Sequence, residues 1–578
     1  MRKQFKIAAI VSAAALLAIG ASMTSFAATG WQEEDGSWVY YNKNGEQVTD
    51  QWEKSGANWF YLGEDGVMVT DALIEYNDQY YYVDSNGAMV TERWIAIDNE
   101  DAGDEDEPDV HWYYFQSNGK ALKKSDSHEH IFKKTLPGGK TYAFDSEGKM
   151  LYGWVRYSDG ERQTGDTAWK EAEYYFGDEN DGAMTIGWRE IAITDDDAED
   201  AQPGDSFWDE DQVRWFYFKS SGKKENGSNN KEGEGDGKTN KKINGKKYGF
   251  DKWGRMIADW YAASVDEASQ GDAAYTETFM YFSSPEDGAR HTKSWFKVVP
   301  GYYLHQSKYE DGDDYWYYAD GDGNLVASEI KSIKGKKYAF DSYGRMKKGL
   351  QLMTVNGNDI IKVYDDDDED YPYDTEDHFK GTALKVEKEN AAAEAANKEK
   401  EEGEEKEPTT HFYFFSNDED HDGSMKTGNQ TVSIDGDNFN FKFEKSGTKK
   451  GQGVSKVDND KHKVYMGGML FKADSDEKVK ILAVSNGVVA VDTKDFLEIV
   501  GATEHQNEKG KADKVDGVSI KKDATYYTWD WKTKSKKNNY VLVNTSGSMV
   551  KSGNKKDGDG YKIVTDGEYG IKMVVVED

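Results

Sequence analysis

A 21-residue register in the first part of the sequence constrains the fold more than any other feature. Gly45, Gly66 and Gly87 follow one another at this spacing. The same step relates a tyrosine, a valine and a threonine column: Tyr40, Tyr61 and Tyr82; Val48, Val69 and Val90; Thr49, Thr70 and Thr91. Because several columns share one register, we predict tandem repeats, each a small unit that packs on its neighbours.

Each unit has the pattern of a β-hairpin. Residues 38–41 are aromatic and β-branched, which is typical of a strand. Residues 42–45 carry the turn signal Asn-Lys-Asn-Gly, and residues 47–49 are the expected second strand. A two-stranded hairpin is marginally stable alone. We therefore expect an all-β solenoid in which stacked hairpins stabilise one another.

Later units are stretched by acidic insertions. One occupies residues 98–109, between Trp94 and Trp112, and others contain the aspartate runs 195–197 and 365–368. The longest insertion is rich in Ala, Glu and Lys, and we expect a short helix within 384–407. Shorter units alternate with the stretched ones around Tyr142, Tyr248 and Tyr338. These short units lack both tryptophan columns, so they are predicted to be scaffold.

The chain divides into four predicted segments. Residues 1–27 combine a basic start, an apolar stretch and Ser25-Phe26-Ala27, which together predict a cleaved signal peptide. Residues 28–97 hold the regular repeats, and residues 98–453 hold alternating long and short repeats. Residues 454–578 are predicted to be degenerate repeats or a small β region. Beyond the signal peptide no apolar run is long enough to span a membrane.

Composition narrows the choice of ligand. The net charge is −36 and aromatic residues make up 13% of the chain. Nucleic acid is an unlikely partner because it requires a basic surface; cations, cationic head groups or neutral sugars fit better. The sequence contains no cysteine, which excludes disulfides and thiolate metal sites, and no cofactor is indicated.

Metal and catalytic motifs are weak or absent in the sequence. The calcium-like loop that starts at residue 418 has Asn429 at the position that requires glutamate. His128 and His130 lack further ligands at suitable spacing for zinc. There is no Gly-x-Ser-x-Gly elbow, P-loop or His-Glu-x-x-His motif. We therefore expect no metal site, no catalytic residues and no enzyme.

The unit that begins Gly30-Trp31 resembles the cell-wall-binding, or choline-binding, repeat of Gram-positive bacteria. Similar repeats occur in glucan-binding proteins and in the C-terminal repeats of clostridial toxins. The resemblance implies a cage of aromatic rings around a quaternary ammonium, drawn from three positions. The first is Trp31, Trp52, Trp94, Trp154 and Trp188; the second is Trp38, Trp59, Trp112, Trp215 and Trp316; the third is Tyr40, Tyr61, Tyr114, Tyr217 and Tyr318. The third unit has Leu73 and Tyr80 instead, so we expect it to lack a complete cage.

These observations predict a secreted, non-catalytic protein that is retained at the bacterial cell wall. Its expected partner is the choline of teichoic acid or another wall polymer, bound by many weak aromatic sites. One alternative is a glucan or host-glycan adhesin that stacks sugars on the same rings. A second is a wall hydrolase or amidase with an unrecognised catalytic part near 455–578. For any single aromatic residue, packing between hairpins is an equally good interpretation.

Overall fold

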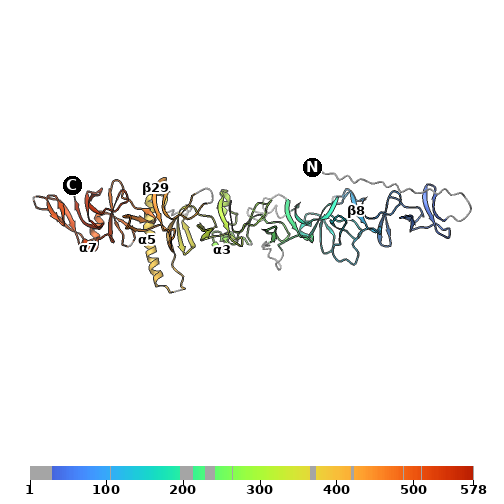
Figure 1. Ribbon diagram of the computed structural model, residues 1–578, viewed down its shortest axis with the longest axis horizontal. Coiled ribbons are helices and arrows are strands. Elements are labelled where there is room, and N and C mark those ends of the chain that lie inside the picture. Colours follow the sequence, from blue (N-terminus) through green and yellow to red (C-terminus); the bar gives the residue numbers. More distant parts are fainter. Residues whose placement is uncertain are drawn as a thin grey trace. The chain divides into compact units, whose positions relative to one another are not determined.

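The structure is a computed structural model that consists of many small antiparallel sheets with few helices (Figure 1). It describes residues 29–104, 106–194, 213–227, 241–262, 264–364, 373–401, 403–417, 422–485, 487–509 and 511–576. The predicted signal peptide and the aspartate runs at 195–197 and 365–368 lie outside these residues. The predicted all-β hairpin fold is confirmed. No helix in the described part of the chain has the length and apolar character needed to cross a membrane.

The chain forms two compact units, which are described separately. The first comprises residues 1–257 and 284–288, and the second comprises residues 258–283 and 289–578. Most strands of the first unit pair with the next strand as antiparallel hairpins, and one sheet has four strands. Its elements are β1 (Gly30–Glu34), β2 (Ser37–Tyr41), β3 (Gln51–Ser55), β4 (Asn58–Leu62), β5 (Ala72–Tyr76), β6 (Gln79–Val83), β7 (Arg93–Asp98), β8 (Val110–Phe115), β9 (Lys133–Thr135), β10 (Thr141–Ala143), β11 (Gly153–Val155), β12 (Arg162–Gln163), α1 (Ala168–Glu171), β13 (Tyr174–Asp178), β14 (Asp181–Met184), β15 (Gly187–Ala192), β16 (Val213–Phe218), β17 (Lys241–Ile243) and β18 (Lys246–Tyr248).

The hairpin turn lies elsewhere than the sequence predicted. The strand that contains Trp31 pairs with the strand that contains Tyr40, and the two are joined by Asp35-Gly36. Both joining residues have positive φ, at 50° and 80°, which suits a two-residue loop that follows the twist of the strands. The expected second strand at 47–49 is reduced to one bridge, between Tyr41 and Gln47. The Asn-Lys-Asn-Gly turn therefore connects one hairpin to the next.

A backbone hydrogen bond joins each hairpin to the one before it. We call the residue two positions after a connecting-turn glycine the post-turn residue. The N–H of the post-turn residue Met68 donates to the carbonyl of Trp38, 2.7 Å away, and that of Met89 donates to Trp59 at 2.8 Å. The same bond runs from Ala121 to Tyr80 in the next hairpin. This arrangement is that of a solenoid, with stability supplied by nearest neighbours.

The turn glycine is required because a methionine of the preceding hairpin approaches it closely. Gly87 has a φ of +77°, and a Cβ at this position would lie 2.8 Å from Cε of Met68. Any other residue would combine backbone strain with this overlap. The glycine column of the sequence therefore records a contact between hairpins as well as a turn.

The second compact unit contains hairpins, larger sheets and most of the helices described. Its elements are β19 (Asp259–Tyr261), η1 (Glu267–Ser269), α3 (Ala273–Thr276), β20 (Met280–Phe282), β21 (Ser294–Val298), α4 (Gln306–Asp311), β22 (Tyr315–Ala319), β23 (Glu329–Ile333), β24 (Lys336–Phe340), β25 (Gly349–Asn356), β26 (Asp359–Tyr364), α5 (Glu376–Glu399), β27 (Thr409–Phe415), β28 (Gly428–Ile434), β29 (Asp437–Phe443), β30 (Lys456–Asp458), β31 (Lys463–Met466), β32 (Met469–Leu470), β33 (Val479–Ala483), β34 (Val489–Val491), α6 (Thr493–Ile499), β35 (Thr503–Gln506), β36 (Asp513–Val515), β37 (Val518–Ile520), β38 (Thr525–Thr528), α7 (Trp531–Lys534), β39 (Tyr540–Asn544), β40 (Ser552–Lys556), β41 (Tyr561–Asp566) and β42 (Ile571–Val576).

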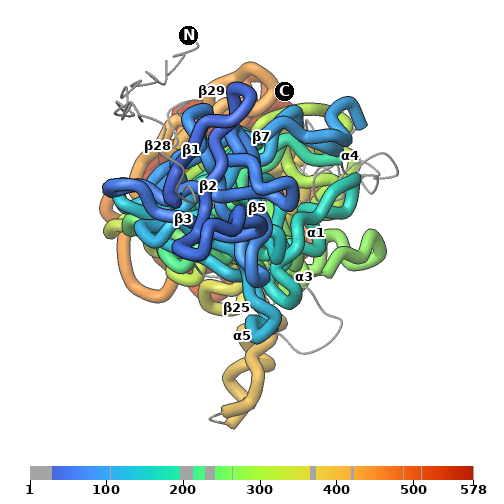
Figure 2. Tube along the Cα trace, turned by 90° about the vertical axis from the view of Figure 1, so that its right-hand side faces the viewer, coloured from blue at the N-terminus to red at the C-terminus, as the bar shows by residue number. Residues whose placement is uncertain are grey.

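The helix expected within 384–407 is α5, which begins earlier, at Glu376, and has 24 residues. Thr375 caps it by accepting a hydrogen bond from the backbone N–H of His378 at 3.2 Å. Phe379, Ala383, Val386 and Asn390 are buried, at the spacing of one helical face. The second half of α5 extends away from the strands (Figure 2).

The C-terminal strands have an aliphatic core. Strands β35, β38, β42, β41 and β40 form one five-stranded sheet, and β34, β33 and β39 form a second. Helix α6 contributes Phe496, which packs with Ile481, Leu542 and Val574, all at most 1% exposed. This β region falls within the predicted segment 454–578.

Candidate functional site

Tryptophan and tyrosine meet across the strands of each hairpin. In the hairpin of β15 and β16, Trp188 lies opposite Tyr217, and the two ring centroids are 5.1 Å apart. Trp215 precedes Tyr217 by two residues, so it lies on the same face of β16. Its ring is 6.4 Å from that of Trp188, at 81° to it. The three predicted site positions therefore do converge in this hairpin.

The following hairpin supplies a fourth ring. Tyr248 on β18 lies 4.8 Å from Trp188, nearly edge-on. We call Trp188, Trp215, Tyr217 and Tyr248 the Trp188 cluster. Tyr248 belongs to a short unit that the sequence predicted to be scaffold, and its ring contacts the first tryptophan of the preceding hairpin. The other three rings are half-buried.

The second compact unit repeats this geometry. Trp295 lies 6.4 Å from Trp316 at 82°, 5.0 Å from Tyr318 and 4.8 Å from Tyr338. We call these four residues the Trp295 cluster. Trp295 was missed because it follows Ser294 and not glycine; its place before the aromatic strand β22 was the available signal.

Three further hairpin pairs contain the same residue types. Trp94 lies 5.3 Å from Tyr114 and 4.9 Å from Tyr142, and Trp112 packs in the same cluster. In the first two hairpins, the ring contacts are Trp31 with Tyr40 and Phe60, each at 5.3 Å, and Trp52 with Tyr61 at 5.2 Å and Tyr81 at 5.1 Å. We call the five sets the two-Trp clusters; their tryptophans are Trp31 and Trp38, Trp52 and Trp59, Trp94 and Trp112, Trp188 and Trp215, and Trp295 and Trp316.

The second-position tryptophans of the first two hairpins differ in exposure. Trp38 is half-buried and lies opposite Glu33. Trp59 is 42% exposed, and the ammonium of Lys54 lies 5.7 Å from its ring centroid. The Lys54 ammonium therefore lies where cation–π attraction to the Trp59 ring is favourable.

In every two-Trp cluster, the backbone N–H of a methionine donates to the carbonyl of the second tryptophan. It is the post-turn residue of the following hairpin: Met68, Met89, Met150, Met256 or Met346. Met150 and Met346 are 8% and 7% exposed and pack in the cores that hold the Trp94 and Trp295 rings. A thioether adapts well to aromatic neighbours. Sequence analysis did not assign this column, although a methionine two residues after the turn glycine recurs visibly.

The remaining hairpin pairs differ in composition. The third hairpin has Leu73 opposite Tyr82 and Ala121 as its post-turn partner, and its cluster is partly aliphatic. Trp154 lies 4.9 Å from Tyr175 and is only 8% exposed. The second position of that hairpin is Glu173 in place of tryptophan.

Burial affects two tyrosines that the following hairpins contribute to these clusters. It raises the pKa of Tyr142 and of Tyr338 above the ordinary value. Neutral phenol rings present a negative π face without a formal charge, which is suited to a cation. Within the described residues, no three His, Asp or Glu side chains are grouped so as to hold a metal ion.

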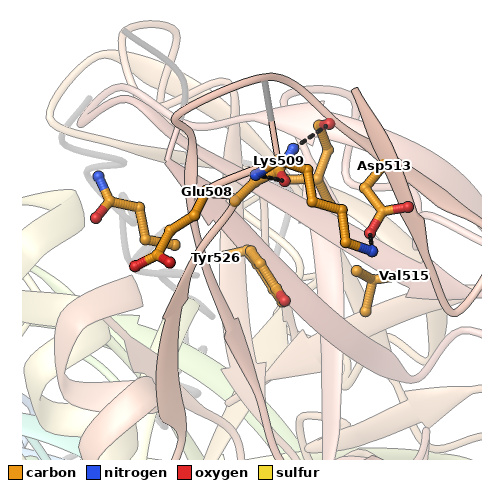
Figure 3. Close-up of a pocket in the computed structure, with 8 residues that line it drawn as sticks. Glu508, Lys509, Asp513, Val515 and Tyr526 are labelled. Carbon is orange, nitrogen blue, oxygen red and sulfur yellow. Dashed lines mark hydrogen bonds and ion pairs between the residues drawn. The ribbon is translucent and has the colours of Figure 1, made fainter. Parts of the chain in front are cut away.

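A separate pocket of about 390 Å³ lies between β35, β36 and β38 and is polar in character (Figure 3). Lys509 and Asp513 form an ion pair of 2.5 Å at its rim. The Asn507 amide donates to the carbonyls of Lys511, Ile520 and Lys521 at 2.9–3.2 Å. These groups hold the rim together and do not resemble the aromatic clusters.

Comparison with known proteins supports the repeat assignment. Residues 28–63 and 49–94 match the model of the choline-binding repeat, which confirms the resemblance inferred from the sequence. No curated protein matches the chain.

Several solved structures from Streptococcus pneumoniae are similar in part. The autolysin LytC, in complex with a synthetic peptidoglycan ligand, is 18% identical, with a TM-score of 0.29; the match covers 57% of this chain and 55% of LytC. Choline binding protein F is 16% identical, with 74% of this chain and 99% of that chain covered and a TM-score of 0.29. The choline-binding domain of CbpL is 17% identical, with 56% and 98% covered and a TM-score of 0.16. The chain thus spans about half the length of LytC, and none of these scores is high enough to transfer a function.

Proposed function

We propose that the two-Trp clusters bind quaternary ammonium groups, and that the protein is thereby held on choline-bearing polymers of the cell wall. The observation that carries this proposal is the near-identical geometry of the Trp188 and Trp295 clusters. Their Trp–Trp separations are both 6.4 Å, and their contacts to the next hairpin are both 4.8 Å. Packing alone does not require two perpendicular, half-buried indoles at each of these hairpins.

The ring arrangement suits a soft, weakly hydrated cation. Each aromatic face contributes about 0.5–2 kcal/mol to cation binding, more when the cation is desolvated. A single cluster of three or four rings therefore gives a weak site. Several such sites along one chain give firm attachment to a polymer that carries many choline groups, since the later sites bind at high effective concentration. The net charge of −36 also favours a cationic ligand.

The repeat match and the predicted signal peptide are consistent with this role. Residues 28–94 match a repeat named for choline binding. Export would place the protein where wall polymers are found. A non-catalytic attachment protein, secreted and retained at the cell surface, is the function that these features support best.

Choline binding can be tested by equilibrium dialysis with radiolabelled choline. We expect up to five equivalents per chain, one for each two-Trp cluster, and no binding of the neutral isostere 3,3-dimethylbutanol. Trp188→Leu should remove one equivalent. The matched control is Trp531→Leu, since Trp531 lies on α7 and away from these clusters. Absence of choline binding by the folded protein would refute the proposal.

Retention on walls is a separate test. We expect the protein to sediment with choline-bearing cell walls and to be released by free choline. Walls from cells grown with ethanolamine in place of choline should not retain it. Retention that persists in excess choline but is competed by glucan would instead favour the sugar-binding alternative. Clearing of a wall zymogram would overturn the non-catalytic assignment.

A further inference from the structure

The cluster around Trp154 departs from the two-Trp clusters at two positions. Trp154 on β11 meets Tyr175 on β13 in its own hairpin and Phe216 on β16 in the next, at 5.2 Å. Glu173 stands where the two-Trp clusters have their second tryptophan, and Lys224 stands where they have methionine. The backbone confirms the equivalence, because the N–H of Lys224 donates to the carbonyl of Glu173 at 2.7 Å.

The Lys224 side chain ends among the rings of this cluster. Its Nζ lies 5.0 Å from the ring centroid of Trp154 and 5.6 Å from that of Phe216. It also donates a hydrogen bond to the carbonyl of Trp169, on α1. Only 4% of Lys224 is exposed. The amine is therefore both enclosed and directed at the faces of the aromatic residues.

The surroundings of Lys224 close this cluster. Trp169, which is 1% exposed, packs in the same core as Trp154 and Phe216. In the two-Trp clusters the equivalent first tryptophans are half-buried. The insertion that carries α1 thus covers a cluster that elsewhere in the array is open on one side.

We propose that Lys224 is a built-in occupant of the aromatic site at Trp154, so that this site is filled by the chain's own amine and is closed to external cations. The prediction about external choline rests on the function proposed above, whereas the occupancy by Lys224 does not. Burial lowers the pKa of Lys224 to about 7, against an opposing effect of Asp251 and Glu173. The side chain can donate to Trp169 as amine or ammonium, and the ammonium form is the one that the aromatic faces attract.

A reciprocal exchange tests whether Lys224 determines access. We expect Lys224→Met combined with Glu173→Trp, which recreates the residues of the two-Trp clusters, to gain one choline equivalent in equilibrium dialysis. Met256→Lys, at the Trp188 cluster, should lose one. Circular dichroism and thermal unfolding verify that each variant is folded. If the folded double variant gains no site and Met256→Lys loses none, the proposal is wrong while the proposed function stands.

A second experiment does not depend on free choline. The chain has no cysteine, so Lys224→Cys can be alkylated at that position alone. One sample receives a trimethylammonioethyl group and the other a 3,3-dimethylbutyl group, which has the same shape without the charge. We expect the cationic adduct to have the higher melting temperature, by a few degrees. An equal or higher melting temperature of the neutral adduct would show that the site does not favour a cation and would overturn the proposal.

Discussion

The aromatic hairpins and the C-terminal β region are stabilised in different ways. In the Trp188 cluster, rings from two hairpins meet and three of them remain half-buried. In the C-terminal sheets, Leu542, Ile571 and Val574 are completely buried in one largely aliphatic cluster. The hairpins depend on nearest neighbours, and this dependence leaves aromatic faces accessible to a ligand. The C-terminal sheets instead pack aliphatic side chains between the strands and helix α6.

The largest expected effect separates the two regions by stability. Phe496→Ala removes a fully buried ring that contacts Trp529 at 5.3 Å and Tyr540 at 5.0 Å. We expect a loss of about 3–5 kcal/mol, measured by urea denaturation, with choline stoichiometry unchanged. Trp188→Leu should have the opposite pattern. It should remove one choline site and lower the free energy of unfolding by less than Phe496→Ala does. Loss of choline binding in Phe496→Ala would show that the two regions are coupled.

The buried amine gives the hairpins a pH dependence. The pKa of Lys224 is about 7 in the folded protein and about 10.4 in an unfolded chain. Between these values the unfolded chain binds more protons, so stability rises with pH, by up to about 1.4 kcal/mol per pH unit for this group. Between pH 6 and 9, we expect the free energy of unfolding of the unchanged protein to rise with pH relative to that of Lys224→Met. If the free energy of unfolding changes with pH in the same way for both proteins, the amine is not buried as described.

Two glycines distinguish backbone strain from contact between hairpins. Gly36 and Gly87 both have positive φ, but only Gly87 faces a neighbour, Met68. We expect Gly36→Ala to cost about 1 kcal/mol from strain, and Gly87→Ala to cost about 1–3 kcal/mol more from the displaced methionine. Urea denaturation of both variants measures the difference. Equal losses would argue that the hairpins pack less closely than described.

The smallest effect concerns an exposed ring. Lys54 lies over the open face of Trp59, so Lys54→Ala should lower stability by about 0.5–1 kcal/mol. Lys54→Arg keeps the charge and should retain most of the stability that Lys54→Ala loses. The tryptophan emission maximum reports the altered environment of the ring. A shift of the same size in both variants would exclude an electrostatic origin.

The sequence register predicted the hairpins and the tryptophan and tyrosine columns because these recur at a fixed local spacing. The hairpin turn was predicted at residues 42–45 and lies at Asp35-Gly36. The prediction was wrong because the first two repeats each contain two Gly-containing turns, and either could join the strands of a hairpin. Trp295 and Tyr248 were missed because insertions vary the distance between positions that meet in space. The role of Lys224 depends on contacts across two hairpins and an insertion, which no periodicity within one unit reveals. Helix α5 was placed too late because its buried face begins at Phe379, before the Ala- and Glu-rich stretch.

The hydrogen bond from each post-turn residue to the preceding hairpin has a consequence for how such a chain changes by recombination. Met256 is bonded to Trp215, so the Trp188 cluster belongs to the junction of two hairpins and to neither alone. Deleting, duplicating or exchanging one hairpin therefore alters the junctions on both of its sides. If the clusters bind as proposed, a rearrangement that brings two existing hairpins together in a new order creates a new junction and with it a new candidate site.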